Sequence, residues 1–408
     1  MKKLIILTFP LFIYAQSLKS LIESAELNNN LVIAKEFIKE AKHKNIDSKK
    51  SSYLPTFDIG GFYQSSNAKP ITEAGDVYSG YAKIGFDIYD GGKKSALLQE
   101  AKSEYKAADH DTHEIKKSLA LDIIENFYAV KNFQASLKAK EDAKNSLQEQ
   151  LLRVKKYFEA GLATKDDIQR LQAAYDTNMY EIESIKLQIA TLFKYLELKT
   201  GVKVDKLDES GFKKFTDDGF EQSDIVKSLI AKKNALLSSA ESISSAYYPY
   251  IKIEDSYSLY GYDRSNSLHP KGLDNQNKIV LSANMRIFDF KTLDKSKEAV
   301  MLSAKALANE ILYKAKEQKA DYEIAVLKIN TQKIKIKSAS SALEASSSAF
   351  KTIEEKYSAG IVDYVVYLDA LKSRTDAYAV YKSALNELET AYAMYYYYSG
   401  KNLTEYIK

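Results

Sequence analysis

The chain has 408 residues, with 59 basic and 55 acidic side chains and a formal net charge of +4 at pH 7. This near balance argues against a nucleic-acid-binding protein. The absence of cysteine excludes disulfides, thiolate metal sites, cysteine nucleophiles and a lipid-modified cysteine.

The N-terminus has the pattern of a secretory signal. Two lysines precede an apolar run over residues 4–14, and Ala15 is suited to cleavage. The apolar run is too short to span a bilayer as a helix, and no later stretch is long and apolar enough. We therefore predict a signal peptide over residues 1–15 and a mature chain without a transmembrane helix.

The next segments predict a helix followed by a β-hairpin. Apolar residues at helical spacing predict a helix over residues 17–52, which Pro55 ends. Residues of about 53–90 then change to a period of two, which is typical of strands. One face of the second strand is apolar and the other polar: Ala82, Ile84, Phe86 and Ile88 alternate with Tyr81, Lys83, Gly85 and Asp87.

A long helix over about 93–160 dominates the first half of the chain. It contains neither glycine nor proline, and at about 1.5 Å per residue it would form a rod of roughly 100 Å. Such a rod needs a lateral partner, and it has an apolar stripe that suits a coiled-coil-like seam. The stripe consists of Phe127, Val130, Leu137, Leu147, Leu151, Val154 and Phe158. A tight turn and a shorter helix over about 164–200 follow.

The same plan occurs twice. When the sequence is shifted by 199 residues, Gly161 falls on Gly360, Gly201 on Gly400 and Asp90 on Asp289. A chance match of two apolar stripes would not explain these glycines and aspartates, so the offset indicates internal duplication. The second stripe is a seven-residue ladder: Ile329, Ile336, Leu343, Phe350 and Tyr357.

The predicted organisation is therefore two repeats joined by a linker. The first repeat covers residues 16–201, the linker 202–221 and the second repeat 222–408. After its own first helix, the second repeat has a hairpin over about 248–289, a long helix over about 291–359 and a helix over about 363–399.

Four strands cannot close a sheet, and an open sheet with an apolar outer face aggregates. The apolar face either packs on helices in a soluble α+β domain or faces lipid in a barrel. The polar opposite face and the tyrosines near the strand ends favour the barrel. Its lipid-facing side chains would be Ile84, Phe86, Leu281 and Met285. A barrel of eight or more strands then requires several chains.

The order of elements resembles the outer membrane efflux protein family, the TolC-like channels. The resemblance rests on Asn28 and Pro55, on residues 88–92, on the turn stretches 158–168 and 357–361, and on the closing Thr200-Gly201 and Ser399-Gly400. It covers nearly the whole mature chain. The second copy of residues 88–92 loses the glycine pair, because Phe290 and Lys291 replace Gly91 and Gly92.

The resemblance implies an α+β, mainly α, homotrimer in the Gram-negative outer membrane. Four strands per chain would form a 12-stranded barrel, continued by a periplasmic coiled-coil barrel of α-helices. The implied function is that of a porin-like exit duct in a tripartite efflux system, which exports small toxic compounds or drugs passively. Its implied partners are a periplasmic adaptor, an inner membrane transporter and outer membrane lipid. Alternatives are an exit duct for type I protein secretion and a periplasmic helical scaffold.

The turns at the two glycines are candidates for the closed periplasmic mouth. The resemblance implies that Asp167 bonds to Tyr357 and that Asp369 belongs to an acidic ring. Val362 and Val366 stand where the family has an arginine and a second acid, so cation selectivity is left open. The turn residues implied to dock the adaptor are Gly161, Leu162, Gly360 and Ile361.

Helix capping is the alternative interpretation of the polar turn residues. Thr164 and Asp167 have the spacing of a capping box, and Asp363 is suited to cap the N-terminus of the following helix. We also assign Asp363 to the predicted gate.

His110, His113 and Glu114 share a helix face with the spacing of metal ligands, but their repeat partners, residues 309–313, include no equivalent. A solvated helix face is the better interpretation. No catalytic or phosphate-binding motif occurs, so we predict no metal, no cofactor, no nucleic-acid partner and no enzymatic activity.

Overall fold

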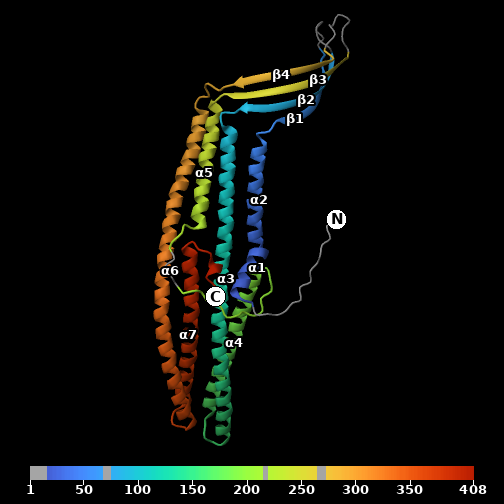
Figure 1. Cartoon of the computed structure of the whole chain (residues 1–408). Helices are drawn as coiled ribbons and strands as arrows, with labels where there is room; N and C mark the ends of the chain where they lie inside the picture. Colours follow the sequence, from blue (N-terminus) through green and yellow to red (C-terminus); the bar gives the residue numbers. More distant parts are fainter. Residues whose placement is uncertain (1–15, 68–74, 215–218, 264–272) are drawn as a thin grey trace. The chain divides into compact units, whose positions relative to one another are not determined.

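The computed structural model describes residues 16–67, 75–214, 219–263 and 273–408. The predicted signal peptide lies outside these residues. The first half of the chain forms α1 (Leu18–Asn28), α2 (Asn30–Ser51), β1 (Thr56–Ser65), β2 (Asp76–Tyr89), α3 (Lys93–Glu159) and α4 (Lys165–Thr200) (Figure 1). The second half forms α5 (Asp224–Ser244), η1 (Ser245–Tyr247), β3 (Tyr250–Asp263), β4 (Asn275–Asn284), α6 (Thr292–Ser358), α7 (Tyr364–Tyr398) and η2 (Leu403–Glu405).

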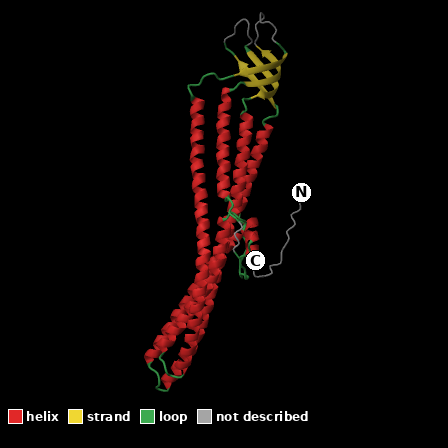
Figure 2. Ribbon diagram, turned by 60° about the vertical axis from the view of Figure 1, so that its left-hand side comes forward, coloured by secondary structure: helices red, strands yellow, loops and turns green. Residues whose placement is uncertain are grey.

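The predicted fold class is confirmed, since the described residues are mainly helical and form one antiparallel sheet of four strands (Figure 2). It divides into two compact units. The first comprises Met1–Lys35, Thr112–Asp224 and Ala315–Lys408, and the second comprises Glu36–Asp111 and Ile225–Lys314. No helix in the described part of the chain is both long and apolar enough to cross a bilayer.

The predicted single helix over residues 17–52 is interrupted at Asn29. Its backbone is extended, and its side-chain Oδ1 accepts a hydrogen bond of 2.8 Å from the backbone N–H of Leu31. Its Nδ2 donates to the carbonyl oxygen of Lys199 at 2.8 Å. Asn29 therefore caps the start of α2 and ties it to the end of α4.

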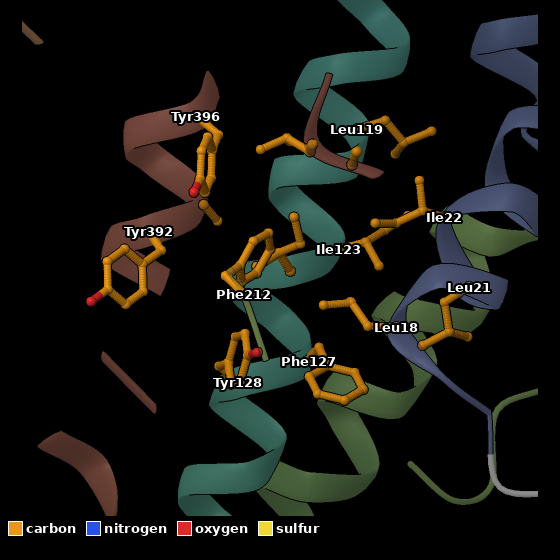
Figure 3. Close-up of a cluster of buried hydrophobic side chains, with 14 of the residues drawn as sticks. Leu18, Leu21, Ile22, Leu119, Ile123, Phe127, Tyr128, Phe212, Tyr392 and Tyr396 are labelled. Carbon is orange, nitrogen blue, oxygen red and sulfur yellow. The ribbon is translucent and has the colours of Figure 1, made fainter. Parts of the chain in front are cut away.

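A hydrophobic core lies in the first unit, where α1, α3, α4, α6 and α7 contribute buried side chains. Leu18 and Ile22 of α1 point toward Ile123 and Phe127 of α3 (Figure 3). Phe212, from the segment between α4 and α5, is buried in the same cluster. The connecting segment thus takes part in the core rather than merely linking the halves.

A second cluster joins the α3–α4 hairpin to the α6–α7 hairpin. Leu147, Leu151 and Val154 of α3 pack there with Leu171, Phe350, Tyr367 and Leu371. These contacts follow the apolar stripes of the two long helices. Phe158 differs, because its side chain is 44% exposed and lies outside this cluster.

The sheet belongs to the second unit and has the order β1-β2-β3-β4, with each neighbouring pair antiparallel. The central pair, β2 and β3, joins the hairpins from the two halves of the chain. β1 and β4 are the edge strands, and each has one strand neighbour in the described chain. Their outer edges therefore present backbone groups that are available for pairing.

Candidate functional site

The strand register puts apolar side chains from all four strands on one face of the sheet. Phe57 lies opposite Ile84, while Phe86 and Leu281 both lie opposite Ile253. These side chains are exposed in the single chain. Three of the residues predicted to face lipid, Ile84, Phe86 and Leu281, share this face, whereas Met285 follows the end of β4.

One acidic residue on this apolar face was not singled out from the sequence. Asp255 lies directly opposite Ile84 on β2 and opposite Ile279 on β4, and its side chain is exposed. The period of two in the sequence could have identified it, because Ile253, Asp255 and Tyr257 are two residues apart and therefore share one face of the strand.

The other face of the sheet carries charges of alternating sign. Lys83 Nζ lies 3.3 Å from Glu254 Oε1, and Lys252 Nζ lies 3.3 Å from Glu254 Oε2. At the end of β2, Lys94 Nζ lies 2.9 Å from Asp87 Oδ2. A face of paired charges suits contact with water, so the sheet has one wettable side and one apolar side.

A cavity of about 840 Å³ lies where α2, α3 and the inner ends of β2, β3 and β4 meet in the second unit. Its charged lining comprises Lys49, Lys93, Lys94, Arg286, Asp87 and Asp90. Basic groups therefore outnumber acidic ones there.

The two helical turns have the same backbone geometry. Gly161 and Gly360 have φ angles of 73° and 74°, which fall in the left-handed region that favours glycine. In each turn the next residue, Leu162 or Ile361, donates its backbone N–H to the carbonyl oxygen five residues earlier, at 2.8 and 2.9 Å. The side chains of Leu162 and Ile361 are exposed. The four predicted docking residues thus form two equivalent turns, each with an exposed apolar side chain.

Asp167 forms the capping box that the spacing indicated. Its carboxylate accepts from the backbone N–H of Thr164 at 2.8 Å, and the Thr164 hydroxyl accepts from the backbone N–H of Asp167 at 3.2 Å. Asp363 caps α7 by accepting from the backbone N–H groups of Val365 and Val366, each at 3.0 Å. Both aspartates therefore stabilise helix starts.

Tyr357 lies with Asp167 in the lining of a cavity of about 420 Å³, without a hydrogen bond between them in the described chain. The Tyr357 ring stacks on Tyr367 with centroids 4.9 Å apart. The Tyr357 hydroxyl is protonated at neutral pH, as tyrosine ordinarily is, and burial raises its pKa further, so it can donate a hydrogen bond. Arg153 of α3 donates to the Ser358 hydroxyl at 3.0 Å, which links the two hairpins beside this cavity. The other predicted gate residue, Asp369, is exposed on α7.

Among the described residues, no group of three or more His, Asp or Glu side chains is arranged to hold a metal ion. His110, His113 and Glu114 instead lie along α3, and all three take part in interactions with other groups.

The two long helical hairpins, and the sheet with one apolar and one charged face, resemble the elements of the outer membrane efflux proteins. The family model described as outer membrane efflux protein matches residues 21–201. The outer membrane protein TolC of Vibrio cholerae is 25% identical over 211 residues, which cover 47% of this chain and 48% of that protein. The match thus spans about half the length of this curated relative.

Solved structures extend the likeness over the whole fold. The Campylobacter jejuni CmeC outer membrane channel superposes with a TM-score of 0.83 at 16% identity, covering 94% of this chain and 85% of that one. The open state of the Neisseria gonorrhoeae MtrE outer membrane channel superposes with a TM-score of 0.77 at 15% identity, covering 95% and 89%. The resemblance predicted from the sequence is confirmed: the family model matches residues 21–201, and the fold is similar over nearly the whole chain.

Proposed function

We propose that three copies of this chain form a passive outer membrane exit duct for small toxic compounds or drugs. The observation that carries this proposal is the four-stranded sheet with two open edges and an exposed apolar face. Its edges need partners, and strands from further copies supply them. Eight strands enclose an interior that side chains fill, whereas the twelve strands of three copies leave room for a lumen.

The two faces of the sheet fit such a barrel. The apolar face meets lipid, and the face with Lys83, Glu254 and Lys252 lines water. A passive conduit of this kind needs no catalytic group. Its energy comes from a partner, for which we propose an inner membrane transporter reached through a periplasmic adaptor.

The exposed turns fit the adaptor role. Leu162 and Ile361 occupy equivalent positions in turns of the same geometry, so each chain offers two similar docking points. A trimer would therefore present six such points, which suits an adaptor that binds each of them in the same way.

Membrane extraction tests the proposal. The protein should leave the envelope only with detergent and should run as a heat-sensitive oligomer of three chains. It should also conduct ions in planar bilayers. Release as a soluble monomer by osmotic shock would instead identify a periplasmic helical scaffold.

Replacing Asp255 with leucine should raise the thermal stability of the oligomer. A carboxylate among Ile84 and Ile279 on a lipid-facing surface is unfavourable, by about 1–2 kcal/mol per copy near mid-membrane. The measurement is the temperature at which the oligomer dissociates in detergent. Asp58→Leu is the matched control, because Asp58 lies opposite Lys83 on the charged face and its loss should lower stability. A destabilised Asp255→Leu oligomer would show that the apolar face does not meet lipid.

Closure of the periplasmic mouth should depend on Asp167 and Tyr357. Both line one cavity, and the Tyr357 hydroxyl can donate to a carboxylate, a bond worth roughly 1.5–3 kcal/mol. We expect Asp167→Ala and Tyr357→Phe to raise single-channel conductance and to sensitise cells to large antibiotics.

The double variant separates gating from capping. Loss of the capping box costs only about 1 kcal/mol, so the yield of oligomer should remain normal. If the double variant conducts like the unmodified protein, these residues cap helices only and other contacts hold the mouth closed.

A further inference from the structure

The junction between β4 and α6 adopts a backbone conformation that is unfavourable for its side chains. Phe290 and Lys291 have φ angles of 54° and 64°, in the left-handed region. At the equivalent places after β2, Gly91 and Gly92 have φ angles of 70° and 85°. The same turn is therefore built once with glycines and once with two bulky residues.

The capping contacts show that the two junctions are otherwise equivalent. Asp90 accepts from the backbone N–H of Lys94 at 2.7 Å, and Asp289 accepts from the backbone N–H of Leu293 at 3.0 Å. Each aspartate thus caps the N-terminus of the long helix that follows it. The backbone strain at Phe290 and Lys291 is therefore caused by their side chains, because glycine residues adopt the same turn without strain.

The surroundings explain why only the first junction needs glycine. A Cβ atom on Gly91 would lie 2.4 Å from the carbonyl oxygen of Ser245 and 2.8 Å from Cβ of Tyr248. The Phe290 side chain, in contrast, is 86% exposed. Packing within the chain therefore does not account for an aromatic residue in this strained position.

Phe290 belongs to an exposed apolar stretch, which we call the junction patch. The patch consists of Met285, Ile287, Phe288 and Phe290, all exposed. The rings of Phe288 and Phe290 meet edge to face with centroids 4.7 Å apart. Such a group of exposed apolar side chains marks an interaction surface.

Exposed aromatic residues stand at the helix-facing ends of the other strands as well. Tyr53 precedes β1, Tyr89 ends β2 and Tyr248 precedes β3. Aromatic rings at one level around a barrel are typical of the boundary between headgroups and acyl chains. The junction patch continues this series after β4.

The charges of the junction favour a lipid surface over a second copy of the chain. Lys291 directly follows the patch, is exposed and has no ion-pair partner in the described part of the chain. Charged residues are depleted in the cores of protein interfaces, whereas basic side chains beside aromatic ones match the phosphates of a phospholipid layer.

We propose that the junction patch inserts into the headgroup boundary of the periplasm-facing leaflet and anchors the channel there. This inference rests on the proposed barrel. The strained turn directs Phe290 outward to the lipid, and Lys291 contacts the phosphates.

The absence of tryptophan from the chain permits a direct test. Phe290→Trp, Ile84→Trp and Leu162→Trp each introduce a single fluorophore. The full-length variants are reconstituted in phosphatidylethanolamine and phosphatidylglycerol vesicles whose acyl chains carry bromine either near the headgroup or near the chain end. We expect Phe290→Trp to be quenched more strongly by bromine near the headgroup, and Leu162→Trp not to be quenched.

The Ile84 variant distinguishes failure of this inference from failure of the barrel. Quenching of Ile84→Trp without quenching of Phe290→Trp would mean that another copy covers the patch, which overturns the anchor. If neither is quenched, the membrane barrel itself is wrong, and the anchor with it.

A second variant separates anchoring from backbone strain. Phe290→Gly relaxes the turn, so the detergent-solubilised oligomer should denature at a higher temperature. Its insertion into vesicles should nevertheless fall several-fold, because the anchoring ring is lost. Higher stability with unchanged insertion would overturn the anchor.

Discussion

Leu281→Arg is expected to abolish assembly of the oligomer in the outer membrane. Leu281 lies on the apolar face, opposite Ile253, and its side chain is exposed in the single chain. An arginine at a mid-membrane position facing lipid costs about 2–4 kcal/mol in each copy. Three copies multiply this cost, so we expect the variant to be degraded in the periplasm. The measurement is the amount of heat-sensitive oligomer in detergent extracts of the envelope.

Gln276→Arg is the matched control, because it adds the same charge to the same strand on the opposite face. Gln276 lies opposite Ser258 on the wettable side, so the variant should assemble normally. Equal tolerance of both variants would remove the assignment of the apolar face to lipid.

Ile84→Arg should be milder than Leu281→Arg, although both change the same face. The register places Asp255 directly opposite Ile84, so the new arginine has a carboxylate within reach. In the Asp255→Leu background the new arginine has no carboxylate to pair with, so Ile84→Arg should then fail to assemble. If the effects of Ile84→Arg and Asp255→Leu on assembly are additive, the new arginine does not pair with Asp255.

The regular elements could be predicted from local patterns. The long helix α3 follows from a run without glycine or proline, and the apolar face of β2 follows from strict alternation at Ile84 and Phe86. Both depend on neighbouring residues only, which a sequence shows directly.

The exceptions depend on contacts between distant residues. Asn29 interrupts a helical pattern because its side chain reaches the carbonyl of Lys199, a partner 170 positions away. Left-handed backbone at Phe290 could not be predicted, because the glycine that normally signals it is missing. Asp255 required the strand register before its neighbours were known.

The candidate gate was only partly predictable for the same reason. The capping box of Thr164 and Asp167 follows from spacing within one turn. Contact between Asp167 and Tyr357 depends on two turns far apart in the chain, and on how further copies assemble around them. The helix caps can therefore be predicted from the sequence alone, whereas the contacts that would close the periplasmic mouth cannot.

Phe350→Ala is the second change with a large expected effect, because Phe350 is central to the contact between the two hairpins. Its side chain is 3% exposed, its ring lies 5.7 Å from that of Tyr367, and the Arg374 guanidinium lies 4.0 Å from its centroid. Removing a buried phenylalanine leaves a cavity and costs about 3–5 kcal/mol. We expect a lower unfolding temperature of the helical part, measured by far-ultraviolet circular dichroism.

Phe158→Ala tests whether burial, rather than membership of the apolar stripe, decides this cost. Phe158 occupies the corresponding stripe of α3, yet its side chain is 44% exposed. A surface substitution of this kind usually changes stability by no more than about 0.5 kcal/mol. The two variants remove the same atoms from residues of the same type, so their difference isolates the packing of the seam. If Phe158→Ala destabilises the protein as much as Phe350→Ala does, then assembly must bury Phe158, and the seam would extend to the ends of the long helices.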